Sequence, residues 1–284
     1  MSNPDIRLAP RQQVKGAADS AFSGRLGLLV LDGDNSDLLA VTAAQVARGA
    51  DLLSIDNTSV LVAEAADPVP PATNDTVLPV EAMLRTFRVD ENFKLSDEQI
   101  DDIDGGRAAS GGIVKQPYEQ LGRRVLIQTG EEKPRVAQLK SVSGRFRMPA
   151  PETRKMTTFT DALEVVSLNG QPLTRKGDSG ALVTTLAGDA LGIIVCGIGS
   201  ASFAAPLVSV LSRKKNILPL TDERIKSYNR EIDERLARDE RPRAAEPASA
   251  KMTVTPEALL STADNDDTNL PDSFFQSVSE EYFG

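Results

Sequence analysis

The chain has 284 residues, of which 40% are hydrophobic, and its 41 acidic and 32 basic residues give a formal net charge of −9. This acidic balance repels phosphate backbones, so we expect no nucleic-acid partner. No apolar run reaches the roughly 20 residues of a membrane span, residues Met1–Lys15 do not resemble a secretory signal, and the lone Cys196 cannot form an internal disulfide, so a cytoplasmic protein with no membrane contact is predicted.

The first 90 residues read as a polar leader followed by strands. Residues 1–21 are expected to be a weakly helical leader. Over residues 22–90, short apolar runs alternate with turn residues, and Asp32–Asn35 is a strong turn signal between two such runs. A first β-barrel is therefore predicted over residues 22–90. Its expected strands are Leu26–Leu31, Asp37–Thr42, Asp51–Ile55, Val60–Ala65 and Val77–Val89.

The middle of the chain predicts a connector and a second barrel. Residues 91–113 carry an acidic centre followed by two Gly-Gly pairs, which is typical of a boundary between two halves. Short strands at regular spacing then resume over residues 114–218, which favours an all-β architecture over βαβ units. The expected strands are Arg123–Thr129, Arg135–Val142, Ala162–Leu168, Ala181–Leu186 and Leu191–Gly197.

The C-terminal region predicts one helix and a disordered acidic tail. Within residues 219–241, an apolar stripe at helical spacing runs along Thr221–Glu240, and Pro242 ends it. Residues 242–284 have the composition of a disordered segment. The tail is nevertheless rich in rings near its end, which predicts either a docking peptide or a segment that folds back on the body. The expected contact residues are Phe274, Phe275, Tyr282 and Phe283.

The candidate nucleophile is Ser179, in the sequence Gly177-Asp178-Ser179-Gly180, and the chain contains no histidine. The glycines allow a tight turn in which the N–H groups of Gly177 and Ser179 can point at one site, as in an oxyanion hole. A serine hydroxyl reacts poorly until a base removes its proton, and histidine is the usual base. Asp178 is interpreted as a turn residue that bonds local backbone N–H groups.

From about Phe22 to Leu211 the chain resembles the trypsin/chymotrypsin-like serine peptidases, especially intracellular bacterial-type members without disulfides. Gly177–Gly180 matches the nucleophile motif, and Val41–Val46 resembles the segment that carries the catalytic histidine, with Gln45 in its place. The resemblance implies a chymotrypsin-like fold, two antiparallel β-barrels with a cleft between them. It also places Glu81 at the position of the catalytic aspartate, with Asp75 as the alternative.

On this interpretation the protein has lost its catalytic base. A neutral amide has no usable basicity near pH 7, so Gln45 cannot accept the proton of Ser179. A lysine base is the remaining route to activity, with Lys176, Lys140 or Lys155 as candidates. We expect no cofactor and no metal, because the chain has no histidine, one cysteine and no recognisable spacing of carboxylate ligands.

Three functions remain open from the sequence. The first is a pseudoprotease, a catalytically impaired homologue that binds a protein or peptide as a regulatory or scaffold module. The second is a serine endopeptidase that uses a base other than histidine, or that is capable only of slow self-cleavage. The third is a structural or assembly component. The sequence leaves the oligomeric state and the identity of a partner undetermined.

Overall fold

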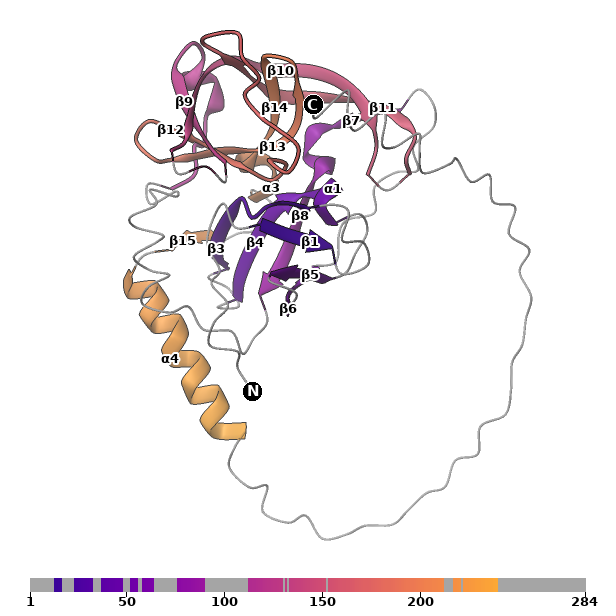
Figure 1. The fold of residues 1–284 in the computed structure, drawn as a ribbon. Coiled ribbons are helices and arrows are strands. Elements are labelled where there is room, and N and C mark those ends of the chain that lie inside the picture. Colours follow the sequence, from indigo (N-terminus) through magenta and orange to yellow (C-terminus); the bar gives the residue numbers. More distant parts are fainter. Residues whose placement is uncertain are drawn as a thin grey trace, which may run out of the picture.

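The computed structural model describes residues 13–16, 23–32, 37–47, 52–55, 58–63, 76–89, 112–129, 131, 133–151, 153–211, 217–220 and 222–239. Strands dominate this part of the chain, in two sheets that lie side by side with the long helix α4 (Asp222–Asp239) at one edge (Figure 1). The predicted disordered tail, including Phe274, Phe275, Tyr282 and Phe283, lies outside the described residues, as does Asp75.

The first sheet has eight strands in the order β15-β3-β4-β8-β6-β5-β1-β2. Strand β2 leads directly into β3 along the chain, separated by only Leu26 and Gly27, and it contacts β4, so the sheet curls round and brings its two ends close together. The strands are β1 (Gln13–Gly16), β2 (Ser23–Arg25), β3 (Leu28–Asp32), β4 (Asp37–Ala43), β5 (Leu52–Ile55), β6 (Thr58–Ala63), β8 (Leu84–Val89) and β15 (Ile217–Pro219). Two short helices, α1 (Ala44–Ala47) and η1 (Val80–Met83), contact each other beside it.

The second sheet has seven strands in the order β10-β9-β12-β13-β14-β11-β7. An additional pairing of β10 with β11 closes six of these strands into a barrel and leaves β7 attached to β11 alone among the described strands. The strands are β7 (Val77–Pro79), β9 (Arg124–Gln128), β10 (Arg135–Pro149), β11 (Met156–Ser167), β12 (Leu182–Thr185), β13 (Ala190–Ile198) and β14 (Ala201–Pro206), and η2 (Pro117–Gln120) precedes β9.

Burial follows the two-residue period of the strands, which is why these segments form barrels. In β10, Phe146 and Met148 are buried whereas Arg145 and Arg147 are exposed. Inside, the ring of Phe146 stacks on that of Phe159, with 5.4 Å between the ring centroids, and contacts the ring of Phe203, with 4.9 Å between the centroids. One apolar cluster includes these rings together with residues of the first barrel, so a shared core joins the two barrels. A second cluster fills the second barrel.

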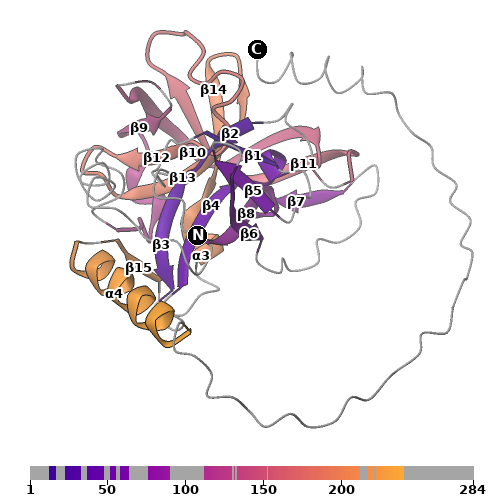
Figure 2. The same ribbon diagram turned by 60° about the horizontal axis from the view of Figure 1, so that its bottom comes forward.

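Helix α4 forms where the sequence predicts it, and its apolar stripe faces the protein. Tyr228 and Ile232, four residues apart, are 6% and 0% exposed and belong to the shared core cluster. The helix packs beside β15 and β3 (Figure 2). The short helix α3 (Leu207–Leu211) follows β14 and contacts β13.

Several local expectations differ from the structure. Strand β10 runs to Pro149 instead of Val142, and β11 begins at Met156 instead of Ala162, because the two strands pair with each other along this extension. Residues 114–218 were assigned to the second barrel, but β15 pairs with β3 of the first sheet. We expected residues 1–21 to be weakly helical, but Gln13–Gly16 is strand β1, because it pairs with both β2 and β5 of the first sheet. We assigned Val77–Val89 to the first barrel, but β7 pairs in parallel with β11 of the second, and only β8 remains in the first sheet. None of the described helices is long and apolar enough to cross a membrane.

Candidate active site

Ser179 lies in a tight turn between the two barrels. The turn is closed by two backbone hydrogen bonds, from Asp178 N to Arg175 O at 3.0 Å and from Ala181 N to Asp178 O at 2.9 Å. Gly177 and Gly180 have φ angles of +92° and +91°, a conformation that residues with a Cβ rarely adopt. The local sequence therefore dictates the sharp reversal of the chain that presents Ser179.

The turn docks on the first barrel through direct backbone contact. The N–H of Arg25 donates to the carbonyl of Ser179 at 2.7 Å, and Thr42 Oγ1 donates to the carbonyl of Arg25 at 2.7 Å. A Cβ at position 24 would lie 2.5 Å from the Ser179 carbonyl oxygen, so only glycine permits this approach. Close packing of the two backbones fixes the position of Ser179 relative to the first barrel.

The structure brings Gln45 to Ser179, although the two residues are 134 positions apart in the sequence. Helix α1 follows strand β4 directly and carries Gln45 into the space between the barrels. The Nε2 amide of Gln45 donates hydrogen bonds to Ser179 Oγ at 2.8 Å and to the backbone carbonyl of Val195 in β13 at 2.5 Å. A backbone carbonyl only accepts hydrogen bonds, so it requires the amide nitrogen, and not the amide oxygen, at this place.

This orientation opposes activation of the serine. In a working serine–base pair the hydroxyl donates its proton to the base, which leaves a lone pair free to attack. Here Ser179 Oγ accepts a hydrogen bond from Gln45, which occupies a lone pair and offers the hydroxyl proton no acceptor. The other end of the amide, Oε1, is buried without a hydrogen-bond partner. The pair is a donor–acceptor contact with no basic atom.

Glu81 lies in helix η1, which contacts α1, the helix of Gln45. Its side chain is half-buried, and it forms no hydrogen bond with Gln45. A carboxylate and an amide oxygen are both acceptors, so Glu81 could not orient the buried Oε1 of Gln45 as an aspartate orients a histidine N–H. Of the three predicted residues, Gln45 and Glu81 thus lie on helices that are in contact, but only Gln45 and Ser179 form a hydrogen bond.

The predicted oxyanion hole consists of two backbone N–H groups that make no backbone hydrogen bond with a described residue. Within the part of the chain that is described, the N–H groups of Gly177 and Ser179 donate to no backbone carbonyl, whereas those of their neighbours Asp178 and Gly180 do. The N–H groups of Gly177 and Ser179 are thereby left without a described backbone acceptor, as an oxyanion hole requires. These two N–H groups remain the candidates for an oxyanion hole beside Ser179.

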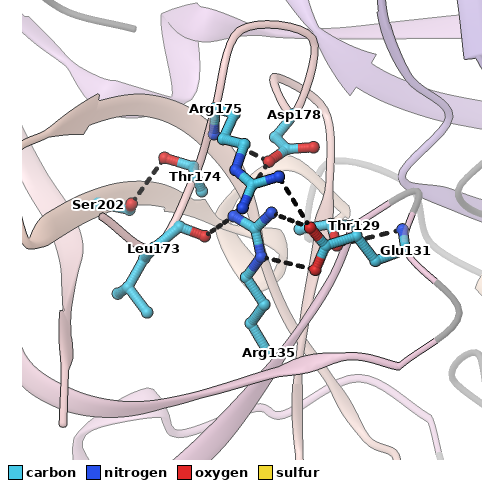
Figure 3. A network of polar contacts seen from close by, with 8 residues as sticks. All are labelled: Thr129, Glu131, Arg135, Leu173, Thr174, Arg175, Asp178 and Ser202. Carbon is cyan, nitrogen blue, oxygen red and sulfur yellow. Dashed lines mark hydrogen bonds and ion pairs between the residues drawn. The ribbon is translucent and has the colours of Figure 1, made fainter. Parts of the chain in front are cut away.

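A network of ion pairs that the sequence did not reveal supports the serine loop (Figure 3). Asp178 Oδ2 accepts from the N–H of Arg175 at 2.9 Å and pairs with Arg135 Nη1 at 3.5 Å. Arg135 also donates to the carbonyl of Leu173 at 2.5 Å and binds both carboxylate oxygens of Glu131, at 2.5 and 3.0 Å. The local role expected for Asp178, bonding a nearby backbone N–H, is present, and Arg135 adds a long-range tie.

The hydrogen bonds and charges of this network shift the pKa values of Glu131 and Arg135. The hydrogen bond from Arg135 is the main reason that the pKa of Glu131 falls below its ordinary value, and the nearby charges of Arg135 and Arg175 lower it further. The same hydrogen bond raises the pKa of Arg135. Only the i,i+4 spacing of Glu131 and Arg135 could have pointed to this pair in the sequence, since Asp178 joins it only in the folded chain.

Among the described residues, no lysine forms a hydrogen bond with the side chain of Ser179. The side chain of Ser179 has Gln45 as its hydrogen-bond partner, and Lys140 pairs instead with Glu164 at 3.0 Å. Lys155 and Lys176 are both exposed. Among the described residues, no group of three or more His, Cys, Asp or Glu side chains is arranged to bind a metal ion.

Cys196, next to Val195 in β13, is fully buried, and burial raises the pKa of its thiol to about 12. Below pH 9 the native thiol stays protonated and shielded, so we expect iodoacetamide to leave it unmodified for hours. In denaturant it should react within minutes. Mass spectrometry of native and unfolded protein checks this, and rapid native modification would contradict the burial of β13.

No protein-family model and no curated protein sequence matches the chain. Solved structures do match. The match to protease A of Thermobifida fusca covers 76% of this chain and the whole of the protease, with a TM-score of 0.52 and 16% identity. A Nocardiopsis protease covers the same share over its full length, with a TM-score of 0.53 and 16% identity. A glutamic-acid-specific serine protease covers 75% over its full length, with a TM-score of 0.51 and 13% identity. These similarities confirm the predicted chymotrypsin-like double barrel.

Proposed function

We propose that the protein is a pseudoprotease, a serine-protease-like double barrel that binds a protein or peptide segment without cleaving it. The observation that carries this proposal is the hydrogen bond from Gln45 Nε2 to Ser179 Oγ. Loss of the base in a comparable protease lowers turnover by about 10⁶ and leaves a residual rate of roughly 10³–10⁴ over water. Such a rate is too low for a proteolytic function.

The edge of β13 beside Ser179 has features suited to holding an extended peptide. Strand β13 pairs with β12 only up to Ile193, and the next residue, Ile194, exchanges hydrogen bonds with the serine loop. From Cys196 to Ile198, β13 pairs with β14 on one side. Its other edge begins at the carbonyl that Gln45 occupies and has no strand partner among the described residues. An extended segment can add to an open strand edge through main-chain hydrogen bonds, next to the two free N–H groups of the serine loop.

A fluorophosphonate probe, which forms a covalent bond with activated serines, tests the proposal directly. We expect labelling of Ser179 at least about a thousandfold slower than that of an active serine protease, since no group removes the hydroxyl proton. Intact mass spectrometry measures the rate, and Ser179→Ala identifies the site. Rapid stoichiometric labelling that Ser179→Ala abolishes would overturn the pseudoprotease and establish a base other than histidine.

Replacing Gln45 by histidine should supply the missing base. In Gln45→His, a neutral imidazole near Ser179 Oγ can accept its proton, so we expect fluorophosphonate labelling to accelerate by about tenfold to a hundredfold. Glu81→Asp in the same chain should increase the gain if the shorter carboxylate can orient the ring. Gln45→Leu is the matched control, because it removes the amide contact without adding a base and should give no gain. Equal rates in the histidine and leucine variants would contradict the role assigned to position 45.

A further inference from the structure

The outward face of the β10–β11 hairpin and of β7 combines cations with apolar side chains. Arg147, Thr158 and Val77 lie in one row across the three strands, because Thr158 pairs with both of the others. Residues in register point to the same side of a sheet. The opposite side carries Phe146, Met148, Phe159 and Leu78, all buried in the shared core. We call the outward side the arm face and define it by Val77, Pro79, Arg145, Arg147, Met156 and Thr158.

The two arginines of the arm face are exposed and form no ion pair with a described residue. The carboxylate closest to them in register is Asp161, and it accepts a hydrogen bond from the hydroxyl of Thr160 instead. Beside the arginines, Val77 is 60% exposed. Alternating unpaired guanidinium groups and exposed apolar surface favour a binding partner that carries both carboxylates and aromatic rings.

The charges of the chain are segregated in a way that matches this face. Residues 114–206, which include most of the second barrel, carry twelve basic and eight acidic residues, a net charge of +4. The last 33 residues, 252–284, carry seven acidic residues and no Lys or Arg, a net charge of −7 in a protein whose total is −9. That same stretch contains four of the rings in the chain, Phe274, Phe275, Tyr282 and Phe283.

We propose that the acidic aromatic segment Asp264–Gly284 docks on the arm face of its own chain. Its carboxylates pair with Arg145 and Arg147, and its rings cover Val77 and the arginine side chains. In the described part of the sheet, β7 is an edge strand, so the segment can also add to it as a strand. This inference does not depend on the chemistry at Ser179.

The stretch of chain between α4 and the docking segment permits this contact and strengthens it. Helix α4 ends at Asp239, 25 residues before Asp264. Such a stretch can extend to roughly 80 Å, at about 3.3 Å per residue, so length does not limit the reach. Exposed ion pairs are individually weak, but a tethered segment acts at an effective concentration in the millimolar range. Weak contacts therefore suffice to keep the segment docked for most of the time.

A nitroxide at position 277 of the full-length chain tests the docking. Because Cys196 is buried, Ser277→Cys provides the accessible thiol for labelling. We expect an immobilised component in the electron paramagnetic resonance spectrum, which Arg145→Glu with Arg147→Glu converts to a mobile one. Lys115→Glu with Lys133→Glu is the matched control. It makes the same change in net charge at exposed positions without ion pairs, and should leave the label immobilised.

Chymotrypsin cleavage at Phe274 and Phe275 provides a second measurement. If the segment docks, reversing both arginines should accelerate cleavage about tenfold, whereas the lysine control should change it little. Spectra recorded over a hundredfold range of protein concentration distinguish docking within one chain from exchange between two copies. A label that is mobile in every variant, or that is immobilised only at high concentration, overturns the proposal.

Discussion

Gly180→Ala should lower the free energy of unfolding by roughly 3–5 kcal/mol, the largest effect that we expect from a single methyl group in this protein. Gly180 has a φ of +91°, and a Cβ there would clash with the carbonyl oxygen of Arg25 and approach Thr42 Oγ1 to 2.6 Å. Both obstacles belong to the contact between the serine loop and the first barrel. The methyl group would therefore force the two barrels apart.

Gly177→Ala is the matched control for this prediction. Gly177 has nearly the same φ, +92°, but a Cβ there meets nothing within 4 Å. The cost should then be limited to backbone strain, about 1 kcal/mol. Urea unfolding followed by far-ultraviolet circular dichroism measures both variants, since the chain has no tryptophan to report by fluorescence. Equal losses in the two variants would show that the barrel contact does not constrain position 180.

Arg135→Met should cost about 2–4 kcal/mol at pH 7, because it leaves an almost fully buried carboxylate without its cation. The side chain of Asp178 is 8% exposed and that of Arg135 is 16% exposed. The variant also removes the donor to the carbonyl of Leu173. Arg175→Met is the matched control. Its guanidinium also pairs with Glu131, but its side chain is 75% exposed, so the loss should stay below about 0.5 kcal/mol.

The pH dependence of the Arg135 effect adds a further check. The pKa of Glu131 is lowered in the folded protein, mainly by its hydrogen bond to Arg135. Its contribution to stability is therefore fully present above the unfolded-state value near 4.5 and is lost as the pH falls through the folded-state pKa. The difference in stability between wild type and Arg135→Met should shrink as the pH is lowered below about 5. A difference that stays constant from pH 7 to pH 3 would exclude Glu131 from the network.

The parts of the fold that depend on local pattern could be predicted. The strand that begins at Arg135, the turn at Ser179 and the stripe of Tyr228 and Ile232 in α4 each follow from periods or residue types within a few positions. The extension of β10 beyond Val142 was not predicted. Strand β1 was missed because its four residues are too short for a period to show. Strand β7 was assigned to the wrong sheet, since pairing with β11 is decided by contacts about 80 residues away.

The candidate site likewise has parts that the local sequence indicates and parts that depend on distant contacts. The nucleophile motif marks Ser179 by its glycines, and the resemblance to serine peptidases drew attention to Gln45. Neither could give the direction of the hydrogen bond between them, which depends on the carbonyl of Val195 on a strand of the other barrel. Arg135 was not found at all, because neither its partner Asp178 nor its acceptor Leu173 is near it in the sequence.

By itself, the sequence determined that the protein is built of strands, that it has a sharply turned serine loop, and that no histidine can serve as its base. Only the tertiary structure decided that an amide donates to the serine, that a largely buried arginine supports the loop, and that two unpaired arginines lie on one outward face. The physical reason is that backbone conformation and burial period are local properties, whereas the partner of a polar group is chosen by whichever distant segment the closed barrels bring beside it.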